Sequence, residues 1–70
     1  MDRYHLNPTP MGWELTDKQT REALLHTVTK EEMFSELDGF MDGKTASVEV
    51  YDRHGTLEEE RPYPGSRHRL

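Results

Sequence analysis

Apolar side chains recur at helical spacing in the segment from Thr29 to Gly43. They occupy positions i, i+1, i+4, i+7 and i+8, and on a 3.6-residue period they form a stripe about 120° wide. Polar and acidic residues occupy the opposite face. The pattern therefore predicts an amphipathic helix whose apolar stripe consists of Met33, Phe34, Leu37, Phe40 and Met41.

Residues at both ends of this segment favour the same helix. Thr29 and Glu32 have the spacing of a capping box, in which each side chain accepts a hydrogen bond from the other residue's backbone N–H. Val28 and Met33 have the spacing of a hydrophobic staple, so we expect them to pack together. Gly43 suits the left-handed conformation that follows many helix ends.

The residues before the helix alternate as they do in strands. We expect strands at 3–7, 13–15 and 22–28. The segment 7–12 contains two prolines and a glycine, which predicts a turn, and 17–20 predicts a tight connection. The third strand contains two adjacent leucines, and the pattern does not decide which of them points inward.

The residues after the helix predict a hairpin. The segment 45–51 alternates small or apolar residues with polar ones, and 52–55 ends in glycine, as short hairpin loops often do. We expect Leu57 to lie across from Val50. The charged run 58–62 ends in proline, which is typical of an edge strand that avoids pairing with another chain.

One amphipathic helix needs a sheet to cover its apolar stripe. We therefore expect a two-layer α+β fold, with an antiparallel sheet and the sequence order β-β-β-α-β-β. We expect residues 1–63 to form one domain and residues 64–70 to form a disordered tail. The predicted core is Tyr4, Leu6, Trp13, Leu15, Leu25, Val28, Met33, Phe34, Leu37, Phe40, Met41, Val48, Val50 and Leu57.

Composition narrows the possible functions. The chain has 70 residues, a formal net charge of −5 and no cysteine. The lack of cysteine excludes disulfides, thiolate metal sites and cysteine nucleophiles. No apolar run reaches the ~18 residues of a membrane span, and the first residues lack the pattern of a signal peptide, so we expect a cytoplasmic protein without a membrane partner. A core this small gives marginal stability, which a homodimer covering the spare sheet face would relieve.

The chain resembles a small bacterial family of domains of unknown function, family twenty-one eighty-eight. The resemblance implies a β-rich sheet with one helix and no established activity. The chain departs from the family pattern at 14–18, where relatives tend to carry basic residues. The matching segments are Tyr4-His5-Leu6-Asn7-Pro8, Gly12-Trp13, Ala23 through Glu32, Val48 through Gly55, and Glu59-Glu60-Arg61-Pro62-Tyr63-Pro64.

Motifs that carry chemistry are weak in this sequence. The segment 39–45 has too few residues between its glycines for a phosphate-binding loop, and it ends a helix instead of beginning one. The segment 38–49 has the length of a calcium loop but lacks two of its ligands. The four histidines form no pair at helical spacing. We therefore expect no metal, no cofactor and no enzymatic activity.

These observations favour a module for protein–protein interaction or self-association. The expected working surface is the sheet face opposite the helix. A further hypothesis concerns acids on the helix (Glu32, Glu36, Asp38 and Asp42), whose face would mimic a nucleic acid or dock a basic partner. The expected binding residues are His5, Trp13, Glu14, Leu24, His26 and Tyr51, of which Trp13 also belongs to the predicted core.

Nucleic-acid binding is the alternative function. Three strands followed by a helix resemble DNA-binding domains of the arm type and the plant AP-two type, in which the sheet enters the major groove. Arg3, Lys18 and Arg21 could line one end of the sheet. The charge argues against this alternative, because 14 acidic residues oppose 9 basic ones and phosphate neutralisation supplies most non-specific affinity.

Overall fold

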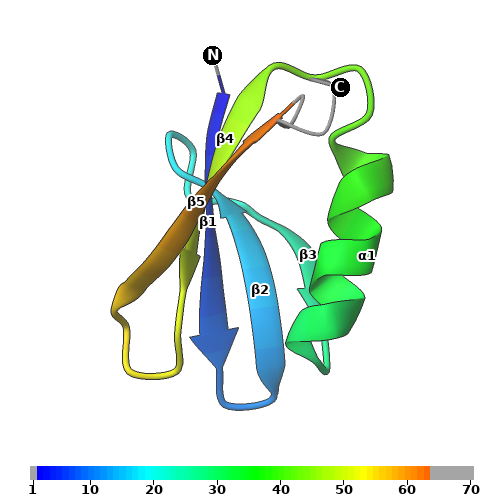
Figure 1. Ribbon diagram of the computed structural model, residues 1–70. Helices are drawn as coiled ribbons and strands as arrows, with labels where there is room; N and C mark the ends of the chain where they lie inside the picture. The colour runs from blue at the N-terminus through cyan, green and yellow to red at the C-terminus, as the bar shows by residue number, and fades with distance from the viewer. Residues whose placement is uncertain (1, 64–70) are drawn as a thin grey trace.

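The computed structural model describes residues 2–63, so the expected tail at 64–70 lies outside the described residues. Five strands and one helix follow in the predicted order, and the α+β prediction is confirmed (Figure 1). The elements are β1 (Asp2–Thr9), β2 (Gly12–Asp17), β3 (Ala23–Thr27), α1 (Lys30–Phe40), β4 (Ala46–Tyr51) and β5 (Leu57–Tyr63).

The five strands form one sheet in the order β3-β2-β1-β4-β5. Three neighbouring pairs are antiparallel, but the central strands β1 and β4 are parallel, so the expectation of a wholly antiparallel sheet was wrong. The cause is the helix between β3 and β4. Because β3 runs in the same direction as β1, α1 carries the chain back to the end where β1 starts, and β4 then runs alongside β1 (Figure 1).

The strand β1 continues further than the turn prediction for 7–12 allowed. Pro8 pairs with Trp13, and Thr9 pairs with Gly12. A proline has no backbone N–H to donate, so it is rarely found where a strand is paired on both sides. Pro8 lies beyond the last pairing of β1 with β4, at Leu6 and Val50, so it can sit in the strand next to β2 alone.

The helix begins with the predicted capping box. The backbone N–H of Glu32 donates to Oγ1 of Thr29 at 3.1 Å, and the N–H of Thr29 donates to Oε1 of Glu32 at 3.2 Å. At the other end, the N–H of Met41 donates to the Leu37 carbonyl at 2.8 Å. Gly43 follows with φ +80°, in the left-handed region as predicted.

The variant Thr29→Ala tests the capping box. It removes the side-chain acceptor, so we expect the free energy of unfolding to fall by about 1 kcal/mol in urea unfolding. Thr29→Ser keeps the hydroxyl and should retain most of that stability. Equal losses in both variants would show that the methyl group of Thr29, and not its hydrogen bond, supports the helix.

The core lies between α1 and the sheet face that it covers. Leu6, Leu15, Met33 and Leu37 are wholly buried, and most of the predicted core is confirmed. Leu25, Phe34 and Phe40 are partly buried and pack against it. The remaining buried members are Tyr4, Trp13, Met41, Val48 and Val50, together with Ala46 and Tyr63, which were not among the predicted core residues.

Two predicted core residues are exposed. Val28 is 68% exposed and Leu57 is 52% exposed. Val28 lies in a bend just past the end of β3, and because its side chain is in solvent the expected staple does not form. A bulge at the end of β4 places Leu57 opposite Tyr51 instead of Val50, on the face away from the helix.

A second bulge settles the orientation of the two adjacent leucines. The register between β2 and β3 shifts between Leu15 and Thr16, so Leu15 pairs with Leu25 and Thr16 with Ala23. The bulge leaves Leu24 as an extra residue on β3. Both leucines are partly buried and pack against the core.

Candidate functional site

One face of the sheet lies opposite α1 and is covered by no other element among residues 2–63. Strand alternation and the pairing register assign polar side chains to this face, which we call the open face. His5, Glu14, His26 and Tyr51, four of the predicted binding residues, belong to it. Its members on β1 to β4 are Arg3, His5, Asn7, Thr9, Glu14, Thr16, Ala23, His26, Ser47, Glu49 and Tyr51.

Glu49 is the centre of a polar cluster on the open face. The hydroxyl of Tyr51 donates to Oε1 of Glu49 at 3.2 Å, and Nε2 of His5 lies 2.8 Å from the same oxygen. Nζ of Lys18 lies 3.4 Å from Oε2. The rings of His5 and Tyr51 meet edge to face, with centroids 5.3 Å apart. We call these four residues the Glu49 cluster.

Two members of the Glu49 cluster have shifted pKa values. Burial opposes the charge on Glu49, but the Tyr51 hydrogen bond, the Lys18 ammonium and His5 outweigh it and hold the pKa of Glu49 below its ordinary value. Burial, followed by the hydrogen bond to Glu49 and its negative charge, raises the pKa of Tyr51. At neutral pH, Glu49 is therefore ionised and Tyr51 keeps the proton that it donates.

These shifts predict how stability depends on pH. Because the pKa of Glu49 is lower in the folded state, the unfolded chain takes up a proton first as the pH falls. The contribution of ionised Glu49 is complete above its ordinary value of 4.5 and is lost as the pH falls through the lower folded-state value. We expect Glu49→Gln to flatten the acid limb of stability against pH, measured by urea unfolding.

Tyr51→Phe is the matched control for Glu49→Gln. It keeps the carboxylate but removes one hydrogen bond to it, so its acid limb should fall between those of Glu49→Gln and the unsubstituted protein. A Glu49→Gln variant with an unchanged acid limb would contradict the prediction. On the alkaline side, the raised pKa of Tyr51 means that its contribution is lost as the pH rises above the ordinary value of 10.0.

A surface hollow of about 410 Å³ lies beside the Glu49 cluster, lined by His5, Thr16, Asp17, Lys18 and Arg21. The loop between β2 and β3 forms one wall. Oδ1 of Asp17 accepts from the backbone N–H of Gln19 at 2.7 Å and of Thr20 at 3.0 Å, which fixes the loop. Arg21 has φ +67°, in the left-handed region.

A smaller hollow of about 240 Å³ adjoins the first, lined by Asp2, Arg3, Asp17, Lys18 and Gln19. Lys18 and Asp17 line both hollows. Arg3, Lys18 and Arg21 therefore gather at one end of the sheet, as expected from the sequence. Acidic residues intersperse with them, so this end carries both signs of charge.

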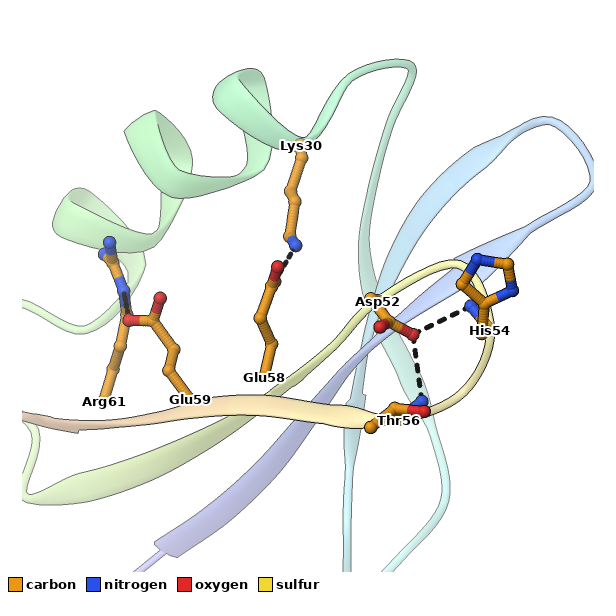
Figure 2. Close-up of polar contacts among 7 residues, drawn as sticks. All are labelled: Lys30, Asp52, His54, Thr56, Glu58, Glu59 and Arg61. Carbon is orange, nitrogen blue, oxygen red and sulfur yellow. Dashed lines mark hydrogen bonds and ion pairs between the residues drawn. The ribbon is translucent and has the colours of Figure 1, made fainter.

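Trp13, the fifth of the predicted binding residues, does not lie on the open face. It is 6% exposed and belongs to the core on the helix side. Nζ of Lys30 lies 5.0 Å above its ring, and Cζ of Arg53 lies 4.9 Å from its centroid. Lys30 also pairs with Glu58 of β5 (Figure 2). Trp13 thus joins the sheet, the start of α1 and the β4–β5 hairpin.

The other predicted binding residues are spread over the sheet. Glu14 and His26 lie directly opposite each other on β2 and β3. His5 and Tyr51 belong to the Glu49 cluster on β1 and β4. Leu24 packs against the core instead of joining them. The structure therefore pairs Glu14 with His26, and brings His5 and Tyr51 together with Glu49 and Lys18.

The hairpin that follows the Glu49 cluster is closed by Asp52. Oδ1 of Asp52 accepts from the backbone N–H of His54 at 2.8 Å and of Thr56 at 3.0 Å (Figure 2). The Thr56 hydrogen bond, against a smaller opposing effect of burial, and the His54 hydrogen bond hold the pKa of Asp52 below its ordinary value. This loop fixes the end of β4, and with it the position of Tyr51.

Within residues 2–63, no group of three or more histidine or acidic side chains is placed to hold a metal ion. The one helix of this described part is too short and too polar to cross a membrane. A scan of protein-family models, a search of curated proteins and a search of solved structures each found no match. The resemblance to family twenty-one eighty-eight stays a prediction.

Proposed function

We propose that this chain is a non-enzymatic protein-binding module and that its open face receives a protein partner. The Glu49 cluster carries the proposal. It holds an ionised carboxylate, whose side chain is 16% exposed, on a sheet face that no other described element covers. Burying charge is unfavourable unless it is paired, and a prearranged network of this kind offers a partner oriented donors and acceptors.

The composition of the open face supports a separate partner more than a permanent homodimer. Obligate homodimer interfaces resemble a cut hydrophobic core, whereas most side chains of the open face are charged or polar, with Leu57 as an apolar member on β5. The hollow beside His5 and Arg21 has room for a partner side chain. Contacts between a partner and the charged and polar side chains of the open face would contribute to specificity and to the association rate more than to affinity.

The test compares two charge-changing variants in affinity capture with mass spectrometry. Glu14→Lys with Thr16→Lys alters the open face, and Glu31→Lys with Asp42→Asn alters the exposed surface of the segment around α1 as a control with the same change in net charge. We expect the control to retain the captured proteins and the open-face variant to lose them. Retention by both variants would contradict the proposal. If the mass measured by sedimentation increases with protein concentration, the open face binds a second copy of this chain instead of a separate partner.

Nucleic-acid binding is the second candidate, since Arg3, Lys18 and Arg21 gather around the two hollows. The same hollows include Asp2 and Asp17, and the net charge is −5. We therefore expect no gel shift with random duplex DNA at ~50 mM salt, where binding through lysine and arginine is strong. A shift that Arg21→Glu abolishes would favour this candidate over protein binding.

A further inference from the structure

A groove separates β3 from α1 on the side of the molecule away from β5. Its volume is about 340 Å³. Figure 1 shows β3 and α1 next to each other at this edge of the sheet, and β3 packs against the helix along the core. The groove is lined on the strand side by His26, Thr27 and Val28, and on the helix side by Glu32, Ser35 and Glu36.

The outer edge of β3 is open to pairing. β3 is the terminal strand of the sheet, and in the described part of the chain no backbone hydrogen bond beyond its ladder with β2 involves residues 23–27. An edge strand presents backbone N–H and C=O groups that can pair with another chain.

The two edges of the sheet differ in their protection. β5 carries three consecutive glutamates and Pro62, which discourage pairing. β3, Ala-Leu-Leu-His-Thr, has no proline and no carboxylate or lysine. The sequence therefore protects one edge and leaves the other available.

We propose that the β3 edge and the adjoining groove bind an extended basic peptide of a partner protein, which adds to the sheet as a sixth strand. This mode takes affinity from main-chain hydrogen bonds and specificity from pockets for alternate side chains. The inference goes beyond the proposed function, because it uses the outer edge of β3 and the groove beside α1, which meet the open face only at His26.

The charge of the groove selects a basic occupant. Glu32 and Glu36 line it, and its lining includes no lysine or arginine. Glu36 makes no ion pair with any residue between 2 and 63. Lysine or arginine side chains of an added strand would meet these carboxylates across the groove.

The same charge disfavours a second copy of this chain as the occupant. A symmetric pair of β3 strands repeats the same surface on both sides of a two-fold axis. The acidic helix faces of both copies would then lie on the same side of the joined sheet, with like charges facing each other. A basic peptide avoids this repulsion, and its charged side chains are attracted to Glu32 and Glu36.

The exposed Val28 fits the same role. It is 68% exposed at the end of β3, where it lines the groove. Its side chain lies outside the core and does not form the expected staple with Met33, so it is free to contact another chain. An apolar residue of the added strand could pack on it, while basic residues on either side meet the helix.

The test is an NMR titration of the isotope-labelled full chain with a synthetic peptide, acetyl-Lys-Val-Lys-Val-Lys-Val-Lys-amide. We expect backbone amide shifts confined to residues 23–28 and 32–36. Glu36→Lys should weaken binding about fivefold or more, since it turns an attraction into a repulsion. Glu31→Lys, on the same helix but outside the groove lining, should change the affinity less than about twofold.

Two further peptides separate strand addition from charge attraction alone. A peptide with the lysines replaced by glutamate should not bind. A peptide with the same charge but with N-methylated valines cannot donate those backbone hydrogen bonds, so we expect at least a fivefold loss. The proposal would be overturned by equal binding of the N-methylated peptide, by shifts confined to His5, Glu49 and Tyr51, or by no binding at millimolar peptide. Concentration-dependent shifts in β3 without peptide would assign the edge to a second copy.

Discussion

Replacing Gly12 with alanine is expected to lower the free energy of unfolding by about 3–5 kcal/mol, the largest effect of an added methyl group at any of the glycines between residues 2 and 63. Gly12 has φ +151°, which L side chains rarely adopt. A Cβ atom at this position would lie 2.2 Å from the Thr27 carbonyl oxygen and 3.0 Å from Cα of Val28. Both contacts are with backbone, so relief requires β2 and β3 to move apart.

Gly39→Ala is the matched control for Gly12→Ala. Gly39 lies in α1, is exposed, and a Cβ atom there meets nothing within 4 Å. Because alanine favours the helix over glycine, we expect Gly39→Ala to raise stability by about 1 kcal/mol in urea unfolding. If Gly12→Ala does not fold in buffer, its stability can be measured in added sulfate, which strengthens folding. Stabilities of Gly12→Ala and the unsubstituted protein that agree within about 0.5 kcal/mol would contradict the close approach.

Local patterns predicted the helix because the interactions that define it are local. The capping box joins Thr29 to a residue three positions later, and the apolar stripe repeats within eleven residues. The same holds for the hairpin at 52–55, where Asp52 accepts hydrogen bonds from its own loop and Gly55 has φ +83°. Sequence spacing contains all the information that such features need.

The parallel pairing of β1 with β4 could not be predicted in this way. It joins residues more than forty positions apart, and it depends on where the helix returns the chain. The two bulges escaped prediction for a related reason. Each adds a residue that no alternation pattern marks, and one of them turned Leu57 from the core to the open face.

The candidate site depends on those long-range pairings. Glu49 meets His5 because the two strands align in register, so a sheet predicted as antiparallel gave no reason to connect them. Lys18 reaches Glu49 from the loop after β2. The strand alternation alone identified His5 and Tyr51 as outward-facing, but only the tertiary fold supplies the carboxylate between them.

The exposure of Leu57 predicts a large difference between two leucines that the sequence pattern treats alike. Leu37 is 0% exposed and Leu57 is 52% exposed. Leu37→Ala leaves a cavity between α1 and the sheet, so we expect the free energy of unfolding to fall by about 2–5 kcal/mol. Leu57→Ala removes a side chain that is half in water already, and we expect a change within about 0.5 kcal/mol.

Urea unfolding of both variants, with the slope of each transition recorded, checks this difference. A change in midpoint at constant slope is a change in stability, whereas a changed slope reports a different extent of unfolding. If Leu57→Ala were as destabilising as Leu37→Ala, Leu57 would belong to the core. The register of β5 would then be one that turns Leu57 to the helix side of the sheet, as the continuous register without a bulge would do by placing it across from Asp52. Since the bulge places Leu57 opposite Tyr51, we expect the two losses to differ by at least about 1.5 kcal/mol.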